Sequence, residues 1–369
     1  MTGSPDGSAQ LSRARALVEL GRFDAALSEL AGVVASDPDN VQARCLLSQA
    51  LLGANRPAEA LTAAQHAIAL SPDDEWPHRL ASIAHHELGD RLGEVAHARE
   101  AARLAPFSWR SLVRLSEALS DGQNSAEANA VAARAVELAP HEAATHSAVG
   151  TAAAAAHRYD EATDAYRRAL SLDPHDAVTQ NNMARVSLAR NSARPTGLAA
   201  AAVGFSRALG TDPTLDVSRK NLELVLRRFL SRTAYYLFVV AYIGGRAAGS
   251  FDGPVARSAP VVLLAAPVWF GWRFVSRLDP AVRRHLLTVA NEPWLRAALA
   301  FAAVAAGSIL ASAAVSTSSR QGLLGVALAA ALISRVCVWL GLLSRRSDPS
   351  SRPRRGRNKP PAGSGPSHR

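Results

Sequence analysis

The stretch AATHSAVGTAAAAAHRYDEATDAYRRALSLDPHD, residues 143–176, defines a pattern that recurs through the first half of the chain. Small and apolar residues fill its two halves, His157-Arg158 separates them, and Pro174 lies near its end. Earlier prolines lie at the same point of each preceding unit, 34 residues apart, and one more follows after 39 residues: Pro38, Pro72, Pro106, Pro140, Pro174 and Pro213. A constant period of this length predicts a helical solenoid, in which each unit buries its apolar face against its neighbours.

Small residues recur at matching positions of successive units, which predicts two closely packed helices in each unit. One series lies in the first helix and another in the second: Ala16, Ala50, Ala84, Ala118 and Ala152, then Ala67, Ala101, Ala135 and Ala169. Turn signals separate the two helices at Gly21-Arg22, Asn55-Arg56, Gly89-Asp90, Gly122-Gln123 and His157-Arg158. The proline ends each unit because it cannot continue a helix and biases the residue before it away from helical geometry.

This pattern resembles the tetratricopeptide repeat, a helix–turn–helix unit of 34 residues, over roughly residues 7–214. We therefore expect an all-α protein whose residues 1–214 form a solenoid of about six repeats. The chain departs from the family pattern at two positions. The glycine that the family has in its first helix is present here only as Gly150, and Glu94 lies where alanine is usual. These departures predict a loosened third repeat. Five extra residues predict a loop within 191–197 of the sixth repeat.

The resemblance implies that the first helices line a concave face that binds an extended peptide or a partner helix. Arginine and asparagine side chains suit a peptide backbone or a carboxylate. The alternative is that these side chains are simply solvated on an exposed helix face. By repeat position, the candidate partner-binding residues are Arg79, Arg110, Arg114, Glu117, Asn181, Asn182 and Arg185.

The C-terminal half has a different composition. Residues 215–232 predict a capping helix with an apolar stripe opposed by Arg219, Lys220, Arg227 and Arg228. Residues 233–343 then contain four apolar stretches, about 233–249, 259–275, 294–315 and 321–343, and these predict a transmembrane region of about four helices. Within the third stretch Ala303, Gly307 and Ala311 predict a small-residue packing face.

Charge is distributed unevenly along the chain. Residues 1–230 hold 23 basic and 27 acidic residues, a net −4, whereas residues 231–369 hold 18 and four, a net +14. Arginines gather before the first apolar stretch, between the second and third, and after the fourth. The N-terminus also lacks the features of a signal peptide. Both observations place the two termini in the cytoplasm, at the inner membrane.

Residues 344–369 predict a basic, disordered tail that binds anionic lipid. The absence of aromatic residues from this tail disfavours nucleic acid as its partner. Nearly all the basic residues are arginine, and this bias favours a GC-rich genome such as an actinobacterial one.

Arg335 is the candidate for intramembrane chemistry, because a charge in mid-span costs roughly 2.5–3.5 kcal/mol on insertion scales. No motif predicts an enzyme, a cofactor or a metal site, since His85-His86-Glu87 lacks a second ligand four residues on. Cys45 is expected in the core of a repeat. The first hypothesis is therefore a membrane-anchored interaction scaffold whose cytoplasmic repeats recruit a peptide or protein partner. The alternative is a membrane transport or assembly component that the repeats regulate.

Overall fold

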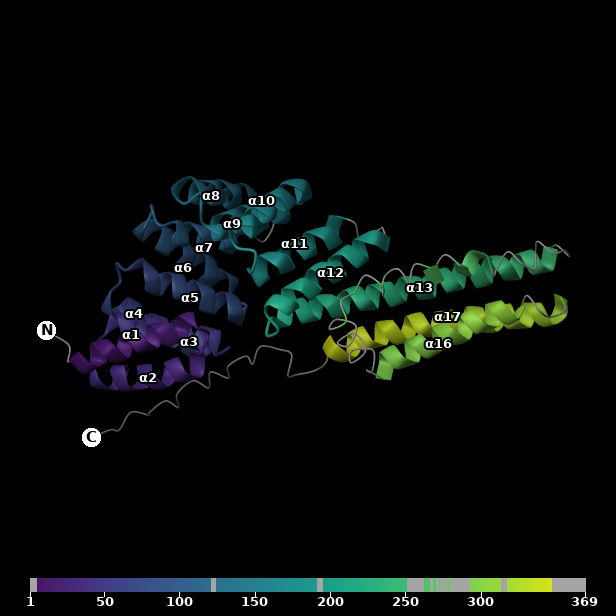
Figure 1. Ribbon diagram of the computed structural model, residues 1–369, viewed down its shortest axis with the longest axis horizontal. Helices are drawn as coiled ribbons and strands as arrows, with labels where there is room; N and C mark the ends of the chain where they lie inside the picture. Colours follow the sequence, from purple (N-terminus) through teal and green to yellow (C-terminus); the bar gives the residue numbers. More distant parts are fainter. Residues whose placement is uncertain are drawn as a thin grey trace, which may run out of the picture. The chain divides into compact units, whose positions relative to one another are not determined.

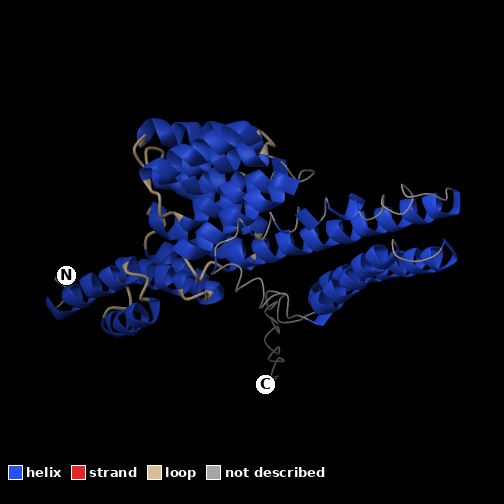
Figure 2. Cartoon of the chain, turned by 45° about the vertical axis from the view of Figure 1, so that its right-hand side comes forward, coloured by secondary structure: helices blue, strands red, loops and turns tan. Residues whose placement is uncertain are grey.

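The computed structural model describes residues 5–120, 124–190, 195–250, 293–312 and 317–346, with short stretches between 262 and 280. Helices are the only regular structure in these ranges (Figure 2). The chain divides into two compact units, a repeat unit (residues 1–229 and 265–289) and an apolar unit (residues 230–264 and 290–369). The helices are α1 (Pro5–Glu19), α2 (Phe23–Ser36), α3 (Val41–Gly53), α4 (Pro57–Leu70), α5 (Glu75–Leu88), α6 (Arg91–Leu104), α7 (Trp109–Leu119), α8 (Ser125–Leu138), α9 (Ala143–Ala155), α10 (Tyr159–Leu172), α11 (Ala177–Arg190), α12 (Pro195–Thr211), α13 (Asp216–Ser250), α16 (Pro293–Ser312) and α17 (Thr317–Arg346).

In the repeat unit, helices α1 to α12 form consecutive helix–turn–helix pairs that stack in sequence order (Figure 1). Each pair also packs on the next, as α4 does on α5 and α8 on α9. The alanines of the two predicted series are buried from the second repeat onward, as Ala50, Ala84, Ala135 and Ala169 show, whereas Ala16 of the first repeat is exposed. The all-helical solenoid expected from the 34-residue period is confirmed.

The turns between paired helices depend on a left-handed residue at one repeated position. Gly21, Asn55, Gly89 and His157 have φ of 70°, 58°, 72° and 59°. Glycine and asparagine adopt this conformation at little cost, and histidine is among the side chains that tolerate it. Four predicted turns are therefore confirmed, and Gly122-Gln123 lies outside the described residues.

Two kinds of side-chain hydrogen bond close the junctions between repeats. At the helix N-termini, Asn40, Asp74 and Asp176 accept from backbone N–H groups at 2.9 to 3.0 Å, as N-caps do. In addition, a polar side chain six residues after a proline reaches back to the carbonyl oxygen of that proline, at 2.7 to 3.2 Å. These side chains are Arg44, His78, His146, Gln180 and Arg219. Because Arg219 belongs to α13, this helix begins where the first helix of another repeat would begin.

The serines at the glycine position of the family connect the two helices of a repeat. Ser48, Ser82 and Ser116 each donate a buried hydrogen bond to a carbonyl oxygen of the following helix, at 2.8, 2.9 and 3.0 Å. The fifth repeat has Gly150 instead, and a Cβ there would lie 2.6 Å from the ring of Tyr166. Glycine therefore makes room for Tyr166, whereas the serines face alanine.

The sixth repeat and its cap differ from the expectations. Helix α12 begins at Pro195, so residues 195–197 of the expected loop are helical, and residues 191–194 lie outside the described ranges. Leu222 and Val225 of α13 are buried as expected. Arg227, expected on the polar face, is buried too. The predicted capping helix and the first apolar stretch form one continuous helix.

In the apolar unit, the second half of α13 packs with α16 and α17. Leu237 and Val240 of α13 share a core with Ile309 of α16 and Leu324 of α17. The expected small-residue face of α16 is wrong, because Ala303, Gly307 and Ala311 are exposed. The buried stripe instead follows Ala298, Ala305 and Ile309, since the larger isoleucine removes more apolar area from water.

One helix in the described ranges is long and apolar enough to cross a membrane, Ser319–Val338 within α17, and Arg296–Ser312 is a shorter apolar helix. The expected four spans are therefore not confirmed. The first predicted span is part of α13, and the second is described only in part. Helix α17 continues to Arg346, beyond the predicted end of the fourth span, and the rest of the tail lies outside the described residues.

Candidate interaction surface

Two grooves and an ionic cluster contain six of the seven predicted partner-binding residues of the repeat unit, and Asn181 lies outside them. The N-terminal groove, of about 690 Å³, has Arg79 and Arg110 in its wall. The C-terminal groove, of about 760 Å³, has Asn182 and Arg185 in its wall. Most of the lining residues come from first helices, α1, α3 and α5 in one groove and α9 and α11 in the other. The central ionic cluster contains Arg114 and Glu117, and the structure does not bring all seven predicted residues together into one site.

In the N-terminal groove, Arg79 is already paired. Its Nε lies 3.2 Å from Oε2 of Glu75, and this carboxylate also accepts from the hydroxyl of Ser111 at 2.9 Å. Arg110 is exposed and stacks on Trp109, with its guanidinium carbon 4.3 Å from the ring centroid. Stacking of this kind orients a guanidinium while leaving its N–H donors free. Of the two predicted arginines in this groove, Arg110 is therefore more accessible to a ligand than Arg79.

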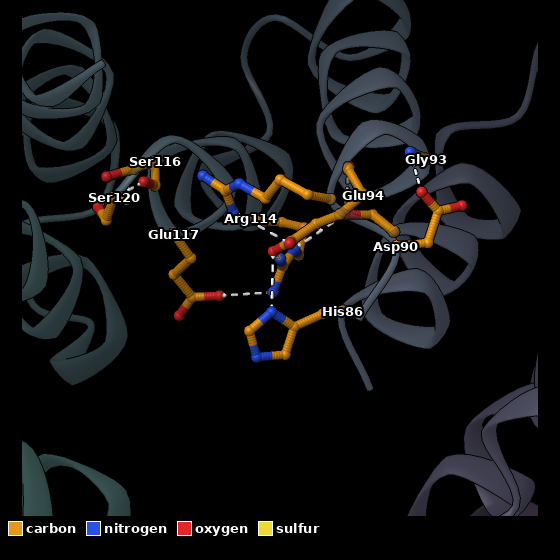
Figure 3. Close-up of polar contacts among 10 residues, drawn as sticks. His86, Asp90, Gly93, Glu94, Arg114, Ser116, Glu117 and Ser120 are labelled. Carbon is orange, nitrogen blue, oxygen red and sulfur yellow. Dashed lines mark hydrogen bonds and ion pairs between the residues drawn. The ribbon is translucent and has the colours of Figure 1, made fainter. Parts of the chain in front are cut away.

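The central ionic cluster connects the third and fourth repeats (Figure 3). Glu94 is 3% exposed and receives Nη2 of Arg114, Nη1 of Arg91 at 3.0 Å and Nδ1 of His86 at 3.0 Å. Arg114 also donates from Nε to the hydroxyl of Ser82 at 3.0 Å. The buried carboxylate of Glu94 is therefore surrounded by donors, and the expected loosening of the third repeat stays a prediction.

The ionic cluster determines how far Arg114 and Glu117 are accessible. Arg114 is 8% exposed, and its Nη1 lies 3.2 Å from Glu117, so its donors serve the protein itself. Glu117 remains 45% exposed. Loss of hydration raises its pKa, although Arg114 opposes this effect. Because the side chain of Glu117 is itself exposed, we attribute this loss of hydration to the surrounding helices of the solenoid and not to atoms that cover the carboxylate.

Beside the C-terminal groove, two adjacent asparagines have different roles. Asn181 is 3% exposed, and its Oδ1 accepts from the hydroxyl of Ser218 at 3.1 Å and from Nδ2 of Asn221 at 3.0 Å. Asn181 therefore joins α11 to α13. Asn182 and Arg185 line the groove instead.

The wall of this groove also includes Tyr166 of the fifth repeat. Its hydroxyl lies 3.1 Å from that of Thr151, and burial raises the pKa of Tyr166 to about 12. Its hydroxyl is therefore neutral at physiological pH.

A histidine cluster in the third repeat was missed in the sequence. Nδ1 of His78 lies 3.1 Å from Nδ1 of His97, and the rings of His85 and His97 stack with centroids 5.3 Å apart. Burial lowers the pKa of His97, and the two neighbouring histidines lower it further. His78 and His97 are 19 residues apart on α5 and α6, so only their matching places on paired helices could have indicated the contact. No group of three or more His, Cys, Asp or Glu side chains in the described ranges is arranged to hold a metal ion.

The structure also locates two further residues that the sequence singled out, Arg335 and Cys45. Arg335 is on the outside of α17, with its guanidinium carbon 5.5 Å from the ring centroid of Tyr235. Cys45 is buried in a repeat core, and burial raises its thiol pKa to about 12. This thiol is therefore not a nucleophile at neutral pH.

Known proteins share these repeats. Residues 11–75 and 143–176 each match a family profile described as "Tetratricopeptide repeat". The comparison with curated proteins gave no match.

Among solved structures, a thermophilic TPR protein of Thermus thermophilus is 21% identical and covers 49% of this chain and 99% of its own, with a TM-score of 0.45. The Cut9–Hcn1 structure of the APC/C is 19% identical over 60% of this chain and 43% of its own, with a TM-score of 0.50. YrrB, titled a TPR protein with an unusual peptide-binding site, is 16% identical over 51% of this chain and 95% of its own, with a TM-score of 0.34.

Tetratricopeptide repeats typically form interaction scaffolds without catalytic activity, and their profiles match the first two repeats and the fifth repeat of this chain. The chain contains tetratricopeptide repeats, built into an all-helical solenoid.

Proposed function

We propose that this protein is an interaction scaffold held at the inner membrane, with cytoplasmic repeats that recruit a peptide or protein partner. The repeats imply the scaffold, and the grooves offer exposed Arg110 and Arg185 as contacts. The membrane anchor rests on one observation, the apolar outer surface of α16 and α17. Side chains on this surface are 41–53% exposed: Leu299, Val304, Leu310, Val326, Leu332 and Ile333.

An exposed surface of this composition is costly in water and favourable in lipid. The described part of the apolar unit contains arginines but no Asp or Glu. Helix α17 is long enough to cross the hydrocarbon core, and because α16 precedes it and packs against it, the pair would bring the chain back to the side on which α16 begins. We place both termini in the cytoplasm, because arginines flank this helix pair on the side of the basic tail, where they meet anionic lipid.

Membrane attachment is tested with the tagged full chain in its host cells. We expect the chain in the membrane pellet after extraction with alkaline carbonate and its release by detergent. Recovery of the chain in the carbonate supernatant would contradict the anchor. Protease added outside intact cells should leave the repeats uncut, and their digestion would contradict the orientation.

Recruitment is tested by cross-linking in cells followed by affinity capture of the tagged full chain. We expect a defined protein partner, reduced in the combined variant R110Q/R185Q and retained in R167Q, whose arginine is exposed on α10 and paired with Asp164. Equal capture by all three chains would contradict binding through the grooves.

The transport or assembly alternative makes the opposite prediction. There, Arg335→Leu abolishes the cellular phenotype while R110Q/R185Q leaves it intact. The exposed position of Arg335, beside Tyr235 and away from the core of the apolar unit, favours the scaffold.

A further inference from the structure

The two grooves of the repeat unit differ in charge. Three arginines line the N-terminal groove, but Glu19, Asp74 and Glu75 line it as well. Arg185 and Arg228 line the C-terminal groove, and no Asp or Glu is among its described lining residues. Both arginines are exposed, and neither forms an ion pair with any residue that the structure describes. Two uncompensated guanidinium groups in one concave surface create a positive potential that attracts carboxylates.

The two arginines come from different helices whose contact is already formed. Arg185 lies on α11 and Arg228 on α13, and Asn181 joins these helices through its buried hydrogen bonds to Ser218 and Asn221. A ligand therefore meets a preformed pair of cations and does not have to order the two helices. Preorganisation of this kind lowers the free-energy cost of binding.

The remaining wall of the C-terminal groove indicates what accompanies the carboxylates. Asn182 and Asn221 provide amide groups, while Ala155, Leu188 and Leu224 provide apolar surface. The volume of about 760 Å³ exceeds the size of a single inorganic anion and suits a short peptide segment. A concave groove with apolar walls also fits a peptide better than it fits the flat surface of a bilayer.

Building on the proposed function, we infer that the C-terminal groove binds an acidic segment of the protein partner. Carboxylates of this segment pair with Arg185 and Arg228, and its apolar side chains contact Ala155 and Leu224. The carboxylates belong either to Asp and Glu side chains or to a chain terminus. The N-terminal groove, where arginines and carboxylates are balanced, does not share this preference.

The test uses the full chain in detergent micelles and a fluorescein-labelled heptapeptide that alternates leucine with aspartate and glutamate. Fluorescence anisotropy should show binding that weakens as the salt concentration rises from about 50 to about 300 mM. R185Q/R228Q should weaken it about tenfold or more, because two charge-assisted contacts are lost. R167Q, the matched control outside both grooves, should stay within about twofold of the unmodified chain.

Amidated and free-acid versions of the peptide separate the two carboxylate sources, since only a terminal contact is lost on amidation. Three results would overturn the inference. They are equal binding of a peptide with lysine at the acidic positions, an equal loss in R167Q, and arginine-dependent binding to phosphatidylglycerol vesicles without binding to the peptide. Circular dichroism of each variant checks that the helices remain.

Failure of this inference is distinguishable from failure of the proposed function. If the tagged chain captures a partner but does not bind the acidic peptide, only the inference fails. If the chain leaves the membrane with carbonate and captures nothing, the proposed function fails whatever the peptide does.

Discussion

Two places in the repeat unit depart from the alanine-rich pattern, and each departure involves two positions at once. At the contact between the third and fourth repeats, Glu94 occupies a position that is alanine in other repeats, and Arg114 occupies one that is leucine in the second and third repeats and alanine in the fifth. In the fifth repeat, Gly150 replaces a serine and Tyr166 replaces an alanine. The first departure adds a buried ion pair, and the second exchanges a hydrogen bond for a larger ring.

The two departures differ in the property that links their two residues. Glu94 and Arg114 depend on each other's charge, because either one left alone in the interior is a buried, unpaired ion. Gly150 and Tyr166 depend on each other's volume, because the interior has no space for both a Cβ and the ring. A departure from a repeat pattern therefore indicates a loosened repeat only when its partner position has not changed as well.

The largest effect is expected from Glu94→Ala, which leaves the guanidinium of Arg114 buried without its main partner. We expect a loss of about 3–5 kcal/mol at the contact between the third and fourth repeats. Chemical denaturation of the full chain in micelles measures it, and hydrogen exchange of α6 and α7 locates it. The double variant E94A/R114L restores the apolar combination and should recover most of the loss. If the double variant is no more stable than E94A, charge dependence is not the reason.

Gly150→Ser should destabilise the fifth repeat by about 1–3 kcal/mol, because the added atoms overlap the Tyr166 ring. Hydrogen exchange should rise in α9 and α10 and remain unchanged in α5 and α6. G150S/Y166A restores the serine–alanine combination of the second, third and fourth repeats and serves as the matched rescue. A single variant as stable as the unmodified chain would show that Tyr166 moves aside freely.

Ser116→Ala tests the hydrogen bond that the fifth repeat lacks. Its hydroxyl donates to the carbonyl oxygen of Ala128 at 3.0 Å in a buried site, so we expect a loss of about 1 kcal/mol. The change in the thermal midpoint of the full chain is the measurement. Ser171→Ala, at an exposed site on α10, is the control and should have almost no effect. Equal changes in the two variants would mean that the buried hydroxyl makes no special contribution.

The smallest effect concerns the histidines of the third repeat. The folded pKa of His97 lies below its unfolded value, so the unfolded chain takes up this proton first as the pH falls. Stability is therefore complete above about pH 6.5 and is lost as the pH falls below that value, with a slope of at most about 1.4 kcal/mol per pH unit for one proton. Thermal midpoints between pH 7.5 and 5.5 measure it. In H97Q the dependence should become shallower, and an unchanged slope would assign it to other groups.

Much of the repeat architecture could be predicted, because its causes lie within one unit of 34 residues. The left-handed turn residues, the helix-breaking prolines and the small residues of each helix pair act locally or between neighbouring helices. The side chains that reach back to the proline carbonyls were missed, although they recur with the same period, because Arg44, His78 and Gln180 share a donor and not a residue type.

The candidate site could be predicted less well. Periodicity identified the helix face of each residue but not its contacts, so buried Asn181 and exposed Arg185 were grouped together. In the apolar unit, hydropathy indicated stretches suited to lipid, yet only the packing on Ile309 revealed which side of α16 is covered.

The sequence by itself determined the helix pairs, their order and the contrast between an alanine-rich repeat array and an apolar, basic C-terminal half. These properties depend on residue type and on a spacing that can be counted along the chain. Only the tertiary structure decided which polar residues remain available to a partner. Arg114 is occupied by Glu94 and Ser82, 20 and 32 residues away, while Arg185 has no ion-pair partner among the described residues. The reason is that a side chain's direction follows from helical geometry, whereas its partners come from neighbouring repeats whose substitutions the period does not reveal.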